Sequence, residues 1–112
     1  MSLSDPNLSL RFQMLKNLKR VIIKIGSSVI TDEKGFLDEV QIGSLVSQIN
    51  WLWKKGIQVL VVSSGAIAAG KGILRLRNGL SSIPQKQAAA AIGQCHLVWV
   101  YEKYFTQFGL EV

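Results

Sequence analysis

The sequence has one cysteine and one histidine, and they are neighbours, Cys95 and His96. A single cysteine excludes a disulfide within the chain and is typical of a reducing compartment, so we expect a cytoplasmic protein. Metal sites in proteins take three or four ligands, and no further cysteine or histidine is present to complete one. The sequence therefore predicts no metal site on this pair.

Long apolar runs and signal-peptide features are also missing. No stretch approaches the ~20 apolar residues that a membrane-spanning helix needs, and residues 1–19 contain no apolar segment of the signal-peptide type. A mitochondrial presequence is the alternative for this segment, but Asp5 and the scarcity of arginine argue against it. We expect no membrane interaction.

Acidic residues are scarce, since seven Asp and Glu stand against 13 Lys and Arg, for a net charge of +6. A basic excess is typical of proteins that bind nucleic acid, but the sequence has no zinc-finger spacing and no aromatic RNA-binding signature. Nucleotide phosphates, or an acidic remainder of a longer chain, explain the charge equally well. We therefore expect no nucleic acid binding through this segment.

The sequence does contain an apolar strand with a lysine near its end. Residues 20–25 are mostly apolar without alternation, which predicts a strand buried on both faces of a parallel sheet. An unpaired Lys24 in such a place costs on the order of several kcal/mol, unless it lies at the strand's carboxyl end and faces an anion. The small, flexible turn Gly26-Ser27-Ser28 then offers N–H groups to a phosphate. The alternative is an edge lysine that reaches water.

A helix is predicted between this strand and a second one. Asp38 has the form of an N-cap, with Gln41 three residues later as in a capping box, and Gly56 ends the pattern. Its apolar stripe at helical spacing comprises Ile42, Leu45, Val46, Ile49, Leu52 and Trp53. Residues 57–62 form the second strand. Strand, helix and strand make a βαβ unit, whose two carboxyl strand ends share one edge of the sheet.

A second turn of small residues follows the second strand. Ser63 or Ser64 is the expected N-cap of the next helix, and Gly65 and Ala66 leave its first turn bare of bulky side chains. A helix start with exposed N–H groups binds anions. The alternative is a compact turn in which the small residues serve packing.

A last long helix is predicted from Ser82 to about Phe108. Its alanine-rich first half, residues 88–93, is small enough for close approach of another element, and its second half is apolar around much of its circumference. Such a helix is buried in a larger body or at a subunit interface. Residues 110–112 look like the start of a third strand. Two strands and two helices cannot cover both faces of a parallel sheet, so we expect the amino-terminal portion of a longer α/β domain.

Three segments together resemble the glutamate kinase branch of the amino acid kinase family. They are residues 21–29 (VIIKIGSSV), 61–70 (VVSSGAIAAG) and 87–94 (QAAAAIGQ). The resemblance implies a three-layer α/β/α sandwich with a mainly parallel sheet, incomplete in this chain. Residues 1–19 are then an N-terminal extension with a short helix, and residues 20–112 the amino-terminal, glutamate-binding part of the kinase domain.

The resemblance also implies an activity, namely ATP-dependent phosphorylation of the γ-carboxylate of L-glutamate, with Mg²⁺ accompanying ATP. Lys24 matches the family lysine that contacts the transferring phosphoryl group, so it is the implied catalytic residue. The implied ATP- and phosphate-binding residues are Lys24, Gly26, Ser27 and Ser28, and the implied glutamate-binding residues are Ser64, Gly65 and Ala66.

Other expectations concern the protein as a whole. Family members generally assemble into dimers or tetramers, which implies a homo-oligomer. The remaining glutamate and nucleotide residues of the family are expected beyond Val112, so we expect residues 1–112 alone to be inactive. The alternatives are an amino acid kinase with another acceptor, and a truncated gene product that acts only as an interaction module through residues 84–108.

Overall fold

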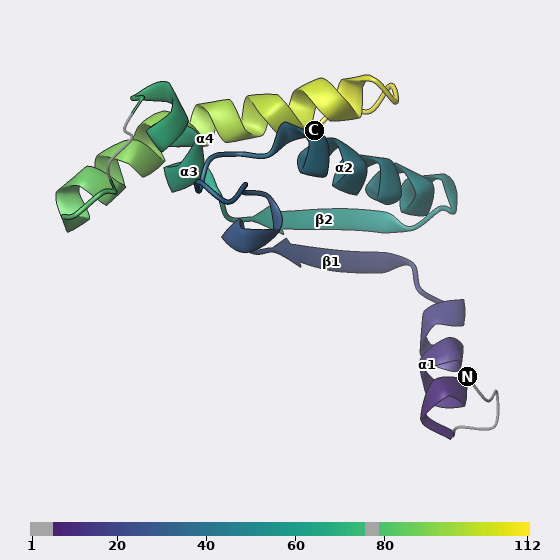
Figure 1. Cartoon of the computed structure of the whole chain (residues 1–112). Coiled ribbons are helices and arrows are strands. Elements are labelled where there is room, and N and C mark those ends of the chain that lie inside the picture. The colour runs from purple at the N-terminus through teal and green to yellow at the C-terminus, as the bar shows by residue number, and fades with distance from the viewer. Residues whose placement is uncertain (1–5, 76–78) are drawn as a thin grey trace.

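The structure is a computed structural model that describes residues 6–75 and 79–112. The elements in chain order are α1 (Pro6–Lys16), β1 (Arg20–Ile25), the 3-10 helix η1 (Ser27–Val29), α2 (Glu39–Lys54), β2 (Gln58–Ser63), α3 (Ala66–Ile73) and α4 (Ile83–Thr106) (Figure 1). The first five residues of the expected N-terminal extension, and residues 76–78 of the loop before α4, lie outside the described residues.

The two strands pair in parallel, in register from Arg20 opposite Gln58 to Ile25 opposite Ser63, with α2 as the crossover. This confirms the predicted βαβ unit. At the start of the sheet, Nε and Nη2 of Arg20 donate to Oε1 of Gln58 over 2.9 and 2.7 Å. This cross-strand pair supports the register at the edge opposite the strand exits.

Within residues 6–75 and 79–112, helices cover one face of the sheet. Ile25 of β1 belongs to the core, and Ile23, Val59 and Val61 pack against it, while α2 and α4 lie on the same side of the two strands (Figure 1). The opposite face is open, with Ile22 64% and Leu60 55% exposed. The α/β class is confirmed, but the predicted burial of the first strand on both faces is wrong, because both helices pack on one side.

The helix α2 begins and ends where the sequence predicts. The side chain of Asp38 accepts a hydrogen bond from the N–H of Gln41 over 3.1 Å, and Gly56 follows the helix with φ +79°. The fully packed part of its apolar stripe is Ile42, Val46 and Ile49. Two details differ from the prediction. Trp53 is half exposed, and Asn50 is buried with no partner for its amide oxygen among the described residues.

The helices α3 and α4 cross through two glycines. A Cβ built on Gly70 would lie 1.8 Å from the carbonyl oxygen of Ala89, and one built on Gly93 would lie 1.8 Å from that of Ala66. No side chain fits between backbones that approach so closely. This confirms the prediction that the small first half of α4 accepts another element, and the crossing anchors the start of α3.

The second half of α4 completes the core. Its buried residues are Leu97, Val100, Tyr101 and Phe105. Apolar side chains of this helix, such as Val98 and Trp99, are about half exposed, so the helix presents apolar surface. The predicted third strand is not formed, since residues 110–112 are irregular and the N–H of Leu110 donates to the carbonyl oxygen of Phe105.

The short helix predicted in the N-terminal extension is present as α1. It projects from the body at the start of β1 (Figure 1), and its apolar side chains are exposed, with Phe12 64% and Leu15 63% accessible. Leu10, Phe12, Met14 and Leu15 are distributed around the helix rather than along one stripe, so no single face is suited to packing on a core.

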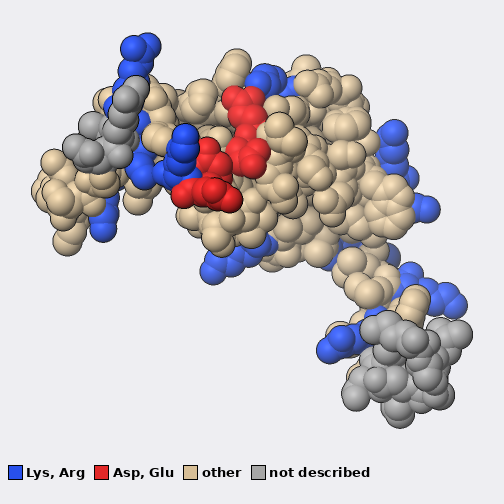
Figure 2. Space-filling view, viewed as in Figure 1, with Lys and Arg blue, Asp and Glu red and all other residues tan. Residues whose placement is uncertain are grey.

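The charged side chains are unevenly distributed. On the face shown in Figure 2, acidic side chains gather near the middle, and basic side chains spread over both ends of the molecule. On this face the basic excess does not form the continuous stripe that tracks a nucleic acid backbone.

Candidate active site at the strand exits

The carboxyl ends of β1 and β2 lie side by side at one edge of the sheet, as predicted. Lys24 is opposite Val62 and Ile25 is opposite Ser63. The ladder continues one residue further, because the N–H of Ser64 donates to the carbonyl oxygen of Ile25 over 2.8 Å. The backbone of Ser64 is therefore held next to the end of β1, at the edge where open α/β sheets bind ligands.

The two turns that follow these strands are packed against each other through Gly65. This residue has φ +114°, in the left-handed region that favours glycine. A Cβ built on it would lie 2.7 Å from Cδ1 of Ile30, a fully buried residue at the end of the first turn. Gly65 is also the N-cap of α3, and no side chain caps that helix. The prediction that Ser63 or Ser64 is the N-cap is therefore wrong, and the close contact of Gly65 with Ile30 agrees with the alternative in which the small residues serve packing.

The first turn is a short 3-10 helix rather than the flexible glycine turn that we predicted. Gly26 is its N-cap with φ −75°, a conformation open to any residue. The N–H groups of Val29 and Ile30 bond within the turn, to the carbonyl oxygens of Gly26 and Ser27. The first N–H groups of a helix have no acceptor inside it. Those of Ser27 and Ser28, both exposed residues, are the donors available to an anion.

Lys24 lies on the open face of the sheet, one residue before β1 ends. Strand alternation places it on the same face as Ile22 and beside Val62. It is exposed, and within residues 6–75 and 79–112 it pairs with no carboxylate. The desolvation cost inferred from the sequence does not arise, because no second layer covers this face. The exposed position of Lys24 is compatible with an anion bound at the strand exits, and equally with the alternative that Lys24 is an edge residue whose ammonium reaches water.

A buried tyrosine of α4, Tyr101, contacts the second turn through Ser63. Ser63 Oγ donates to the carbonyl oxygen of Ser64 over 2.7 Å and lies 2.8 Å from the hydroxyl oxygen of Tyr101 on α4. Tyr101 is 7% exposed, and burial raises the pKa of its hydroxyl. Sequence analysis did not find this contact. The one available signal was that a buried tyrosine hydroxyl usually finds a partner.

A second polar contact joins α2 to α4 away from the turns. The ammonium of Lys103 bonds to Oε2 of Glu39, which also accepts from the hydroxyl of Tyr104 over 3.3 Å. The hydrogen bond from Lys103 lowers the pKa of Glu39, and the same bond raises the pKa of Lys103. Because the pair is partly exposed, it contributes little to stability, and its role is to hold the first turn of α2 against α4.

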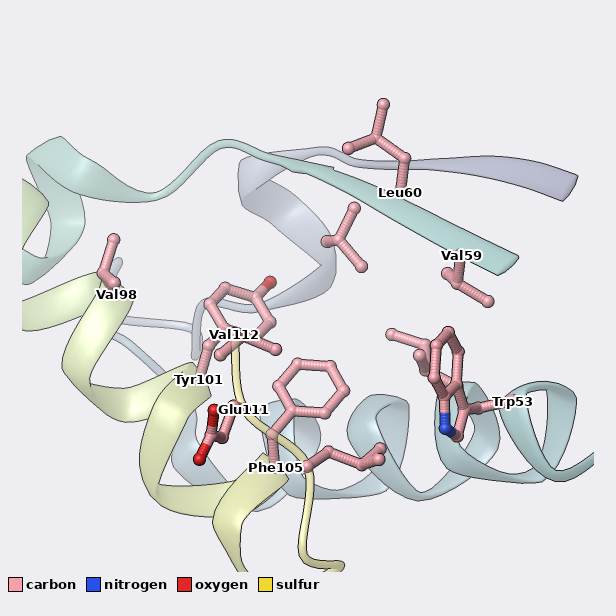
Figure 3. Close-up of a pocket in the computed structure, with 11 residues that line it drawn as sticks. Trp53, Val59, Leu60, Val98, Tyr101, Phe105, Glu111 and Val112 are labelled. Atoms are coloured by element: carbon pink, nitrogen blue, oxygen red, sulfur yellow. The ribbon is translucent and has the colours of Figure 1, made fainter. Parts of the chain in front are cut away.

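The apolar cavity shown in Figure 3 lies along β2 and not at the strand exits. It measures about 380 Å³, and its walls include Trp53, Val59, Phe105, Leu110 and Val112. None of the predicted site residues lines it. Its walls are mostly apolar, and the one charged residue among them, the acidic Glu111, would repel phosphate or carboxylate, so we do not assign the chemistry to this cavity.

Two further properties bear on the site. Among the described residues, no three His, Cys, Asp or Glu side chains are grouped as metal ligands. None of the helices in the described ranges is both long and apolar enough to cross a membrane.

Comparison with known proteins identifies relatives of this chain. It is 54% identical over 102 residues to a glutamate 5-kinase of Syntrophus aciditrophicus, which covers 91% of the chain and 26% of that protein. A glutamate 5-kinase of Clostridium acetobutylicum is 48% identical over 99 residues, covering 88% of the chain and 37% of the relative. One of Pelobacter propionicus is 47% identical over 103 residues, covering 92% and 28%.

The chain thus spans only about a quarter to a little over a third of the length of these curated relatives. Residues 19–112 match the amino acid kinase family. This range contains both strand exits and the α3–α4 crossing. The chain belongs to the amino acid kinase family.

Proposed function

We propose that this chain is the amino-terminal, glutamate-binding part of a kinase that phosphorylates the γ-carboxylate of L-glutamate with ATP. Residues 20–112 form that part, and residues 1–19 are an extension. The observation that carries the proposal is the packing of Gly65 on Ile30, which brings the Ser27-Ser28 turn and the Ser64–Ala66 turn together at one edge. The names of the relatives support glutamate as the acceptor.

The proposed reaction joins two anions. A carboxylate oxygen of glutamate attacks the γ-phosphorus of ATP, the bond between that phosphorus and the bridging β–γ oxygen breaks, and γ-glutamyl phosphate and ADP are formed. Such a transfer needs alignment and charge neutralisation more than covalent help from the protein. In this proposal the ammonium of Lys24 and the N–H groups of Ser27 and Ser28, on the Gly26 turn, neutralise the phosphoryl oxygens.

The acceptor is assigned to the second turn. The hydroxyl of Ser64 and the N–H groups of Gly65 and Ala66 at the start of α3 are donors for a glutamate carboxylate. Their backbone is held in place on both sides, by the bond from Ser64 to Ile25 and by the contact of Gly65 with Ile30. A preorganised group of donors of this kind needs no rearrangement during the reaction.

We propose that the whole protein uses ATP and Mg²⁺. Residues of this chain support the ATP phosphates better than the ion. The exposed Lys24 and the free N–H groups of η1 fit a phosphate. The described residues present no grouped carboxylates for a divalent ion, so we assign no Mg²⁺ ligand here and expect the ion to arrive on the ATP phosphates, where it would neutralise charge. Exposed apolar side chains on α4, such as Val98 and Trp99, support a homo-oligomer of the whole protein.

The proposal is tested in a chimaera in which this chain replaces the matching 102 residues of the Syntrophus aciditrophicus relative. We expect the chimaera to phosphorylate glutamate in preference to aspartate, acetylglutamate and carbamate, and we expect residues 1–112 alone to be inactive. An active chimaera that prefers another acceptor, or an inactive one that binds neither ATP nor glutamate, would contradict the proposal.

Two substitutions in the chimaera test the assigned roles. Lys24→Ala should reduce kcat by about 10²–10³, the usual effect of removing one preorganised donor, whereas Ser64→Ala should raise the KM for glutamate more than the KM for ATP. Lys54→Ala is the matched control, because Lys54 is an exposed lysine in the last turn of α2, at the opposite edge of the sheet. Equal, small effects of all three would refute the assignments.

A further inference from the structure

The contact between Tyr101 and Ser63 has a defined donor direction. A serine hydroxyl has one hydrogen to donate and two lone pairs that accept. The hydrogen of Ser63 is directed to the carbonyl oxygen of Ser64, over 2.7 Å. Tyr101 must therefore donate to Ser63 over the 2.8 Å that separate the two oxygens. The result is a chain of hydrogen bonds from the core to the second turn.

These hydrogen bonds orient the peptide unit between Ser64 and Gly65, at the edge of the sheet where the strands end. In a trans peptide the N–H points opposite to the carbonyl. When the carbonyl of Ser64 is held toward Ser63, on the α4 side, the N–H of Gly65 points away from it. That N–H has no acceptor among the described residues, and the side chain of Ser64 beside it is exposed. The carbonyl is held toward α4, and the N–H of the buried Gly65 is left without a partner in the described part of the chain.

We propose that Tyr101 is a positioning residue for the acceptor site, which acts through Ser63 to keep the Gly65 N–H directed at the carboxylate of the bound substrate. The inference rests on the proposed function. Tyr101 contacts neither reactant in this account and is not catalytic. It is well suited to positioning, because it is buried, stacks on Phe105 with ring centroids 6.4 Å apart, and is carried by the helix that crosses α3. A tyrosine hydroxyl is protonated at neutral pH, and hence a donor, and burial raises its pKa further above the ordinary value of 10.0.

The test is Tyr101→Phe in the chimaera, which removes the hydroxyl and keeps the ring in the core. The loss of one hydrogen bond should raise the KM for glutamate about three- to tenfold, with the KM for ATP unchanged. Tyr104→Phe is the matched control, because it removes a hydroxyl from the same helix whose partner is Glu39. Ser63→Ala should reproduce the effect of Tyr101→Phe, and Ser63→Thr, which keeps the hydroxyl, should restore the KM.

The double variant Tyr101→Phe with Ser63→Ala should be little worse than either single variant, because both break the same chain. Additive effects, or equal KM values for glutamate in the Tyr101 and Tyr104 variants, would overturn the proposal. A purely structural role would instead lower the melting temperature and change both KM values together, and that result would also overturn it.

A second readout separates this inference from the proposed function. In the amide spectrum of the chimaera without substrate, the Gly65 resonance should shift in Tyr101→Phe and not in Tyr104→Phe. If the chimaera phosphorylates no glutamate, the proposed function fails, and the Gly65 resonance alone then tests the hydrogen bonds from Tyr101 to Ser63 and Ser64. An unshifted Gly65 resonance refutes their positioning role even if the chimaera is active.

Discussion

Substituting Gly65 by alanine tests the contact on which the site depends. The new Cβ would meet two obstacles. The backbone is at φ +114°, where alanine is strained, and Cδ1 of Ile30 would be 2.7 Å away. Ile30 is fully buried and has no solvent to move into. The backbone strain costs about 1–3 kcal/mol and the overlap a further ~1–3 kcal/mol, so Gly65→Ala should destabilise the fold by about 2–6 kcal/mol.

The two contributions can be separated by a second substitution. Ile30→Val removes Cδ1, after which the nearest remaining atom is Cδ2 of Leu37 at 3.4 Å, an ordinary contact. Alone, Ile30→Val should cost about 0.5–1.5 kcal/mol. Combined with Gly65→Ala it should recover about 1–2 kcal/mol relative to the sum of the single effects, because the overlap is relieved and the backbone strain is not.

The assay is urea unfolding of the chimaera followed by circular dichroism, together with the KM for glutamate. Gly79→Ala is the control, because a Cβ on Gly79 would meet nothing within 4 Å, and it should change stability by no more than about 0.5 kcal/mol. Gly65→Ala should also raise the KM for glutamate, since the turn must move away from Ile30. A Gly65→Ala protein as stable as the control, or a double variant with no coupling, would refute the packing of the two turns.

Two further predictions concern the support of the site. Gly93→Ala should destabilise the chimaera by about 3 kcal/mol or more, because the new Cβ would lie 1.8 Å from the carbonyl oxygen of Ala66; a melting temperature equal to that of Gly79→Ala would contradict the close crossing. The hydrogen bond from Lys103 lowers the pKa of Glu39 from its ordinary 4.5. The ionised carboxylate therefore stabilises the fold above pH 4.5, and this stabilisation is lost as the pH falls through the lower pKa of the folded state. The melting temperature of Glu39→Gln should therefore lie below that of the parent at neutral pH and converge with it in acid; a difference that persists well below the folded-state pKa would contradict this.

The parts of the fold that local sequence determines were predicted correctly. Asp38 and Gly56 bound α2 because an N-cap side chain and a left-handed glycine act on the residues next to them. The helix α4 begins at the predicted position, where Ser82 is the N-cap and forms a complete capping box with Gln85. The parallel pairing followed from the strand–helix–strand order alone.

The errors arose where a long-range partner decides the outcome. The apolar run in residues 20–25 predicted burial on both faces, yet helices cover one face and Ile22 is exposed. Residues 110–112 have strand composition but no strand beside them to pair with in the described part of the chain. In both cases the composition fits a sheet larger than the two strands described here.

At the site, the sequence predicted which residues lie at one edge of the sheet but not how they are held. The strand order placed Lys24 and Ser64 at one edge. It could not show that Gly65 takes the N-cap position, because that depends on the distant side chain of Ile30. Tyr101 was missed for the same reason, since its contact with Ser63 spans 38 positions in the sequence.

The central claim is that the two strand exits form one site for two anions. It is tested most directly by a crystal structure of the chimaera with glutamate and a non-hydrolysable ATP analogue. We expect the glutamate carboxylate on Ser64 and the Gly65 N–H, and the terminal phosphate on Lys24 and the Ser27 N–H, close enough to react. Either ligand bound elsewhere, or the two held on opposite faces of the sheet, would contradict the claim.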